Sequence, residues 1–429
     1  MWRIELERPV ADMPKSGQSR IMAAMQPTFP LDRAEKRRAI LDAVEGLREV
    51  AAAHAGESEA SETLAPAVVE AMAESGLWAL KLPAELGGAE ADPVTQIEAI
   101  EAMTSIDTSA GWALMIGATS VGWPGAFLPK AGMRRVFGDA DRLPTAAGIG
   151  GISGTAVPVE GGYRVTGRFA FSSGIRHAEW LLAGAPIARG EDAPAEARTF
   201  VVPAEKATVH LDSWHVAGLK GSGSHDFSLE DVFVPEEMSW DRSIMMTGTP
   251  ERGGAIFRLG MPAFTANEHA AFALGCARRA LDLLGEMSGK RRRATGTALV
   301  AIGDRPVFQH FYGEADQRLK AVRAHTLQVF EQAWQTACSG RVPDARAQAE
   351  VRACAVLVTD TCVDIVNQAF HYAGGSALQE SNVLQRYWRD VNAGAQHMAV
   401  SNAAYEAYGQ VLLGIEAGPQ TAPGGIGRA

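Results

Sequence analysis

The stretch YWRDVNAGAQHMAVS (Tyr387–Ser401) lies in the last of four long segments with apolar stripes, and its own pattern is that of a helix. An Arg-Asp pair, Arg389 and Asp390, is followed seven residues later by a lone histidine, His397. A histidine on the inner face of a helix is either a hydrogen-bonded core side chain or an acid/base group that titrates near neutrality. The rest of the sequence has to decide between these two interpretations.

The segment that contains this stretch is one of four in the C-terminal part, each roughly 25 to 35 residues long. Four long apolar-striped helices predict a four-helix bundle, which we place at residues 241–418. The remaining residues, 419–429, are rich in Pro and Gly and are expected to be disordered. The four helix-like segments are residues 266–293, 307–338, 345–373 and 382–414.

The middle of the chain has a different texture, with frequent Gly and Pro and with β-branched residues that alternate with polar ones. GGYRVTGRFAF (Gly161–Phe171) alternates in this way directly after a Gly-Gly turn. Several short strands at this spacing predict a β-sandwich or barrel over residues 143–240.

The first third of the chain has helical periodicity again, and we expect an N-terminal helical domain at residues 31–142. Residues 1–30 mix charges with Pro and Gly and are expected to form a flexible leader, with Met22 and Met25 as alternative starts. The order of helices, strands and then longer helices predicts an α+β protein.

The net charge of −10 argues against nucleic acid or an anionic membrane surface as the main partner, because both attract basic patches. The uncharged stretch Thr108–Pro129 has the length of a membrane span, but its Gly, Ser and Thr content and Pro124 favour a helix buried in protein. The four widely spaced cysteines lack metal-ligand spacing, so we expect no metal site and a reducing, cytoplasmic compartment.

Five short motifs in this order resemble the acyl-CoA dehydrogenase superfamily, and most closely its branch of two-component, reduced-flavin-dependent monooxygenases. Each motif is weak alone, but together they cover the chain from about Leu31 to Gly414. The motifs are SIDTSAGW (Ser105–Trp112), GGYRVTGRFAFSSGIRHAEW (Gly161–Trp180), WHVAGLKGSGSHDFSLEDVFVP (Trp214–Pro235), GCARRALD (Gly275–Asp282) and HYAGGSALQESNVLQRYWRDVNAGAQH (His371–His397).

The resemblance implies a homotetramer that binds reduced flavin, FMNH2 or FADH2, between the β domain and the bundle. Ser173 matches a position beside the reactive N5 atom of the isoalloxazine ring, with Ser172 next to it. Phe171 matches a side chain that packs against the ring. The alternative is that the two serines only cap a strand.

The resemblance implies further flavin contacts, one of them from a neighbouring subunit. Arg293 matches an arginine that reaches the flavin phosphates, as bidentate Arg–phosphate pairing allows, but it also lies in an ordinary run of surface charges. Gln309 and the pair Gly374-Gly375 match other flavin-side positions, and the glycine pair also reads as a plain turn between helices.

The resemblance separates two reactions at the opening stretch. A dehydrogenase of this family needs a carboxylate to remove a proton, placed where this chain has Met398 or, in some members, Thr265. Glu268 is the nearest acidic residue and keeps a dehydrogenase with a displaced base open. The monooxygenase branch has a histidine at the position of His397, where an imidazole can hold or deliver the proton that a C4a-hydroperoxyflavin needs.

One position departs from the monooxygenase pattern. Many members of the branch carry a second active-site histidine about nine residues after a Gly-Trp pair, here Gly111-Trp112. This chain has Ser120 instead, which leaves N-, S- or unusual C-oxygenation open beside aromatic hydroxylation. We expect an apolar substrate pocket, with core packing as the alternative role of its residues, lined by Trp112, Ser120, Trp123 and Met398.

These observations lead to three hypotheses. The first is a monooxygenase that takes reduced FMN or FAD from a separate NAD(P)H:flavin reductase and uses O2 to oxygenate a small, aromatic or heterocyclic substrate. The chain itself has no dinucleotide-binding fingerprint, which agrees with a separate reductase. The second is an FAD-dependent dehydrogenase of CoA- or carrier-bound substrates, and the third is a catalytically inactive paralogue that acts as a binding subunit.

Overall fold

The computed structural model describes residues 28–138, 142–148, 150–188, 196–290, 292–295 and 298–415, and for residues 293–295, 298 and 299 it describes only the backbone. The predicted leader therefore lies outside the described residues except for residues 28–30, as does the whole of the predicted tail 419–429.

Helices form the first part of the described chain, and their starts follow from capping side chains. Asp32 and Asp92 accept backbone N–H groups at the starts of α1 and α4, and Pro93 occupies the first position of α4. In α5 every residue except Ile116 is buried, which confirms the predicted buried helix. The helices are α1 (Arg33–Gly46), α2 (Arg48–Ala60), α3 (Pro66–Glu74), α4 (Pro93–Ile106), α5 (Thr108–Phe127) and α6 (Lys130–Phe137).

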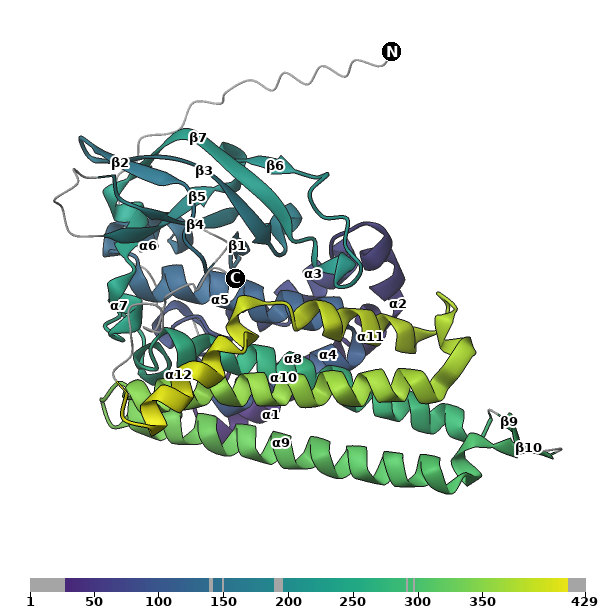
Figure 1. Ribbon diagram of the computed structural model, residues 1–429. Helices are drawn as coiled ribbons and strands as arrows, with labels where there is room; N and C mark the ends of the chain where they lie inside the picture. The colour runs from purple at the N-terminus through teal and green to yellow at the C-terminus, as the bar shows by residue number, and fades with distance from the viewer. Residues whose placement is uncertain are drawn as a thin grey trace, which may run out of the picture.

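The strands form two four-stranded sheets, which lie above α5 in Figure 1. All ladders in these sheets are antiparallel except the parallel pair β1–β4. The first sheet has the order β1 (Ala146–Gly148), β4 (Trp180–Pro186), β5 (Ala197–Pro203), β8 (Ser239–Asp241). The second has the order β2 (Thr155–Val159), β3 (Gly162–Ser172), β7 (His225–Pro235), β6 (Thr208–His210).

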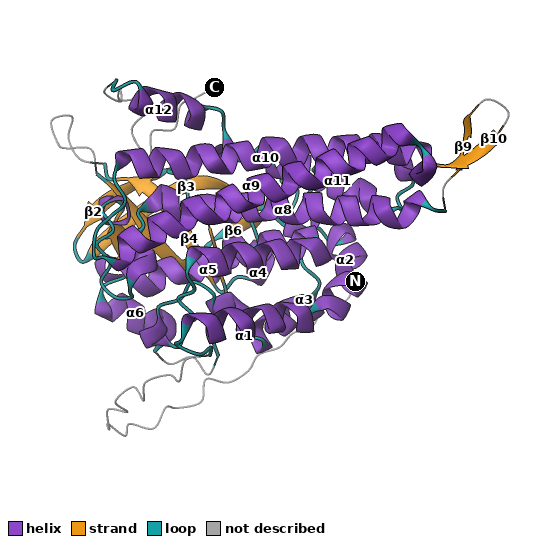
Figure 2. Ribbon diagram, turned by 90° about the horizontal axis from the view of Figure 1, so that it is seen from below, coloured by secondary structure: helices purple, strands orange, loops and turns teal. Residues whose placement is uncertain are grey.

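Long helices return after the sheets and run side by side below α5 (Figures 1 and 2), which confirms the α+β class and the C-terminal bundle. A two-stranded hairpin projects from one end of the bundle (Figure 2). The elements are α7 (Ser243–Met246), α8 (Met261–Ser288), β9 (Arg292–Thr295), β10 (Ala298–Ala301), α9 (Pro306–Cys338), α10 (Ala345–Ala373), α11 (Val383–Gly394) and α12 (Ala403–Leu412).

The prediction of a single helix over residues 382–414 is wrong, because this segment forms two helices, α11 and α12, separated by a 3₁₀ turn at Met398–Val400. The break follows Gly394, which packs so closely on α8 that a Cβ there would lie 2.6 Å from Cε1 of Phe272. His397 then adopts an extended backbone and caps the turn with its own side chain. The histidine is therefore presented from a turn and not from a helix face.

No helix in the described ranges is long and apolar enough to cross a bilayer.

Candidate active site

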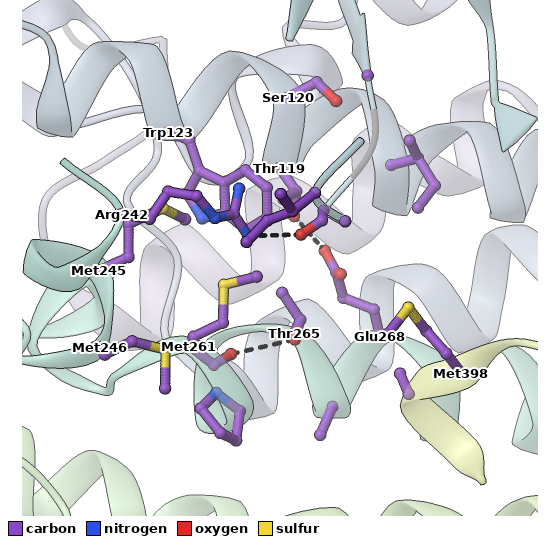
Figure 3. Close-up of a pocket in the computed structure, with 18 of the residues that line it drawn as sticks. Thr119, Ser120, Trp123, Arg242, Met245, Met246, Met261, Thr265, Glu268 and Met398 are labelled. Atoms are coloured by element: carbon purple, nitrogen blue, oxygen red, sulfur yellow. Dashed lines mark hydrogen bonds between the residues drawn. The ribbon is translucent and has the colours of Figure 1, made fainter. Parts of the chain in front are cut away.

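A cavity of about 760 Å³ lies between the sheets, α5 and the bundle (Figure 3). Its wall combines one side of α5, the start of α8, the β8–α7 connection and the turn that follows α11. A cavity of this size suits a small organic ligand. Three of the four residues predicted to line a substrate pocket, Ser120, Trp123 and Met398, line this cavity.

Two histidine rings stack at the wall of this cavity, one from the turn after α11 and one from α8. The ring centroids of His397 and His269 are 4.2 Å apart, with an interplanar angle of 27°. Trp112 lies edge-on to both rings, with its centroid 5.9 Å from that of His397 and 5.7 Å from that of His269. Trp112, the fourth predicted pocket residue, therefore packs behind the histidine pair and is not part of the cavity lining.

A backbone hydrogen bond defines the tautomer of the His397 ring. The amide of Ala399 donates to Nδ1 of His397 at 3.2 Å, so the neutral ring carries its proton on Nε2. Burial lowers the pKa of His397 to about 4, which keeps the ring neutral at physiological pH. In this state His397 is a hydrogen-bond donor at Nε2.

The second ring, His269, is almost fully buried, with 5% of its surface exposed. Its Nδ1 has no hydrogen-bond partner among the described residues. Burial lowers the pKa of His269 well below its usual value, and His397 and Lys81 lower it further. An unpartnered buried nitrogen is costly, so it indicates a group that binds here.

Trp112 also joins the histidine pair to the segment predicted to contact flavin. Its indole N–H donates to Oγ of Ser173 at 3.0 Å. Ser173 in turn shares a 2.7 Å hydrogen bond with Ser224, which shares another of 2.7 Å with Ser222. The predicted cofactor-side hydroxyl and the predicted catalytic histidine are thus linked through one tryptophan.

The neighbouring residues Phe171 and Ser172 fit a bound flavin. Oγ of Ser172 is buried and lacks a hydrogen-bond partner in the part of the chain that the structure describes. The ring of Phe171 is 70% exposed, on a backbone with φ of 64° next to a register shift in the β3–β7 ladder. Left-handed φ and an exposed aromatic ring are both unfavourable in isolation, which is typical of a ligand-binding position.

Glu268, the candidate dehydrogenase base, lines the cavity, but its carboxylate already interacts with two side chains of the protein. Its Oε1 lies 2.6 Å from Nζ of Lys81 and accepts a 2.6 Å hydrogen bond from Thr119 (Figure 3). Burial raises the pKa of Glu268 and lowers the pKa of Lys81. A carboxylate that is paired in this way is a poor proton acceptor for a substrate, because protonating it would leave the buried Lys81 without its counter-ion.

None of the predicted cofactor residues whose side chains the structure describes lines this cavity, and Gln309, Gly374 and Gly375 lie elsewhere in the bundle. Gln309 donates to the carbonyl of Gly303 near the start of α9, and Gly374 ends α10 with φ of 60°. A hydrogen bond from Tyr372 to Val307 joins these two helix ends, so Gln309, Gly374 and Gly375 lie in one region of the bundle. The side chain of Arg293 lies outside the described residues.

Family models agree with the fold. The model "Acyl-CoA dehydrogenase, N-terminal domain" matches residues 34–127, and "Acyl-CoA dehydrogenase, C-terminal domain" matches residues 268–402. The two matches together span more than half of the 429 residues. The chain belongs to the acyl-CoA dehydrogenase family.

Within this family, the similar proteins include flavin-dependent monooxygenases. Indole-3-acetate monooxygenase of Pseudomonas putida is 28% identical over 364 residues, which are 84% of this chain and 90% of that protein. The flavin-dependent monooxygenase oxygenase subunit HsaA of Rhodococcus jostii is 28% identical over 353 residues, which are 81% of this chain and 91% of that protein. The predicted resemblance to the monooxygenase branch is confirmed.

A solved structure of this acyl-CoA dehydrogenase fold holds the reduced cofactor. XiaF from Streptomyces sp., in complex with FADH2 and glycerol, superposes with a TM-score of 0.84 at 27% identity. The match covers 90% of this chain and 97% of XiaF. The fold predicted from the five motifs is therefore confirmed at the level of the whole chain.

His269 is the site residue that sequence reasoning missed. The prediction looked for a second histidine near Ser120 on α5, whereas the structure supplies one from α8. The signal was present in the spacing, because His269 lies four residues after Thr265 and one residue after Glu268, both of which line the cavity.

Proposed function

We propose that the protein is the oxygenase component of a two-component flavin-dependent monooxygenase that oxygenates a small organic substrate in the cavity. The observation that carries the proposal is the stacked pair His397–His269, which borders the cavity and is joined through Trp112 to Ser173. A separate NAD(P)H:flavin reductase would deliver FMNH2 or FADH2, in keeping with the oxygenase subunits among its relatives.

Bound reduced flavin would supply the electrons that reduce O2 and allow one oxygen atom to reach the substrate. Neutral His397 carries N–H at Nε2, which can donate a hydrogen bond to an oxygen atom placed in the cavity. Trp112 fixes Ser173 through its indole N–H, so that the serine hydroxyl keeps one orientation. The apolar wall around Trp123 and Met261 limits access of water to that proton.

We further propose a homotetramer in which Gln309, Gly374, Gly375 and Arg293 contact the flavin of a neighbouring subunit. In support, Gln309 and the glycine pair lie together where the start of α9 meets the end of α10. Large apolar side chains are also exposed on the late elements of the bundle, as expected for a self-complementary interface. These side chains are Leu357, Leu378, Val383, Leu412 and Leu413.

The described structure offers little support for a dehydrogenase. Met398 and Thr265 occupy the two positions at which the family places its catalytic Glu, and Glu268 is paired with Lys81. A non-catalytic role is disfavoured by the unpartnered buried atoms of Ser172 and His269, which a packing role leaves unexplained. A reducing, cytoplasmic location is proposed because the four cysteines are unpaired, and three of them are buried.

The test is to mix the purified full chain with reduced FMN or FAD, O2 and a panel of aromatic and heterocyclic compounds. Oxygenated product and the H2O2 released per flavin oxidised are then measured. We expect product with at least one compound and H2O2 below one equivalent. Tight copurification of oxidised FAD that an acyl-CoA reduces, without any oxygenated product, would overturn the proposal.

A further inference from the structure

The cavity wall contains two arginines, Arg242 and Arg352, that lack an acidic partner among the residues that the structure describes. Arg242, between β8 and α7, donates from Nη1 to Oγ1 of Thr199 at 3.0 Å and from Nη2 to the carbonyl oxygen of Gly150 at 2.6 Å. Both acceptors are uncharged. Gly184 makes room for this side chain, since a Cβ there would lie 3.0 Å from Nη1 of Arg242.

The second arginine, Arg352, reaches the cavity from α10. It makes no hydrogen bond or ion pair with any residue that the structure describes. Burial lowers the pKa of Arg242 and of Arg352, and no nearby carboxylate raises either one again. A guanidinium nevertheless remains protonated in a protein, so both residues bring positive charge to the cavity.

The acidic residues of the described wall do not neutralise these two charges. Glu268 is paired with Lys81, and Glu196 lies 3.3 Å from the guanidinium of Arg198. Asp241 accepts the backbone N–H of Ser243 at 2.8 Å. Arg242 and Arg352 are both half-buried, and partial removal of a charge from water without a counter-ion is unfavourable, so the pair points to a ligand that supplies the negative charge.

The surroundings of Arg242 define the rest of that ligand. Its side chain lies beside Trp123 and Met245, with Met261 below it (Figure 3). Thioether and indole groups favour an aromatic ring. A carboxylate matches the fork of a guanidinium, and Arg242 still has N–H groups beyond the two that donate to Thr199 and Gly150.

We infer that the substrate of this enzyme is an aromatic carboxylate, whose ring fills the Trp- and Met-lined part of the cavity and whose carboxylate binds Arg242, while Arg352 adds positive charge to the same cavity. That the ligand is a substrate rests on the proposed function, whereas the preference for an aromatic carboxylate rests on the residues that line the cavity. The arginines act as specificity residues, because they select which compounds are positioned beside His397 and take no part in proton transfer.

Calorimetric titration of the full chain in the absence of flavin tests this preference separately from catalysis. The ligands are matched pairs that differ only in charge: phenyl-, naphthyl- and indole-3-acetate against the corresponding acetamides. We expect at least one carboxylate to bind roughly 10- to 100-fold more tightly than its amide, as charge-assisted hydrogen bonding gives. If no carboxylate binds better than its amide, the inference is overturned.

Variants assign the preference to the two arginines. Arg352→Gln removes no hydrogen bond or ion pair with a described residue and should fold normally, while the carboxylate-to-amide ratio falls by roughly 10-fold. Arg242→Gln should act likewise, and Arg242→Lys keeps the charge if the glutamine variant folds poorly. Arg318→Gln, which alters a surface ion pair with Asp364, is the control and should leave the ratio unchanged. An unchanged ratio in both cavity variants would contradict the inference.

A flavin phosphate is the competing anion, and a second titration separates it from a substrate. If the arginines held that phosphate, Arg242→Gln and Arg352→Gln would weaken FMN relative to riboflavin, which would overturn the inference. We expect the FMN-to-riboflavin ratio to remain unchanged. Failure to form oxygenated product would refute the proposed function alone, whereas efficient turnover of neutral compounds with no carboxylate preference would refute only this inference.

Discussion

Asp390 and His397 are seven residues apart in one motif, yet their surroundings are opposite. Asp390 is 2% exposed, accepts the amide of Leu219 at 2.5 Å and also accepts the hydroxyl of Thr108. His397 follows the helix break, makes one hydrogen bond through Nδ1 and borders the cavity. A side chain whose hydrogen bonds are all satisfied holds the fold together, while one that keeps a free donor beside a cavity is available for chemistry.

The largest effect is expected from removing the imidazole. His397→Ala should lower the rate of product formation by about 10²- to 10⁴-fold, the range for loss of a general acid or base, and should leave the free energy of unfolding within about 1 kcal/mol. Product formation and H2O2 release are measured together under reduced flavin and O2. His215→Ala, an exposed histidine beside Glu62, is the control. Equal product formation in both variants would show that His397 has no catalytic role.

The next effect is on stability. Asp390→Ala removes the acceptor of the Leu219 amide and of the Thr108 hydroxyl, so we expect a loss of about 2–3 kcal/mol in the free energy of unfolding. Urea unfolding followed by circular dichroism measures it. Asp364→Ala, which alters a half-exposed ion pair with Arg318, should cost less than about 1 kcal/mol. A similar loss in the two variants would remove the distinction between Asp390 and surface carboxylates.

The pH dependence of stability sharpens the comparison further. The pKa of His397 is about 4 in the folded chain, against about 6.5 when unfolded, so between these values the unfolded chain binds more protons. The stability linked to neutral His397 is complete above pH 6.5 and is lost as the pH falls toward 4. Between pH 7 and pH 5 the wild type should therefore lose about 1–2 kcal/mol more stability than His397→Gln. Parallel losses in the two proteins would place the pKa of His397 near its ordinary value.

The smallest effect concerns the link between the histidine pair and Ser173. Trp112→Phe keeps an aromatic ring but removes the N–H that donates to Ser173. The free energy of unfolding should therefore fall by about 1 kcal/mol. Because the serine loses its fixed orientation, we expect a few-fold rise in H2O2 released per product formed. Trp334→Phe, on the bundle helix α9, is the control for a tryptophan substitution. Unchanged H2O2 release would show that the Trp112–Ser173 bond has no part in coupling.

The sequence predicted the order of helices and strands, because apolar periodicity and turn residues are local signals. It also predicted the family, because five motifs occur in one order. It could not predict the break after Gly394, which depends on contact with Phe272 from another helix. For the same reason it missed the stacking of His269 on His397 and the presence of Arg242 and Arg352 in one cavity, which depend on distant segments.

Methionines form much of the wall on which this chemistry would take place. Met245, Met246, Met261 and Met398 all line the cavity, and Met398 is 50% exposed. Thioethers react with hydrogen peroxide to form sulfoxides, which are polar and enlarge the side chain. Each turnover that releases hydrogen peroxide instead of product would then expose the methionines of the cavity wall to oxidation. The number of catalytic cycles that the enzyme completes before inactivation would then depend on the fraction of cycles that release hydrogen peroxide.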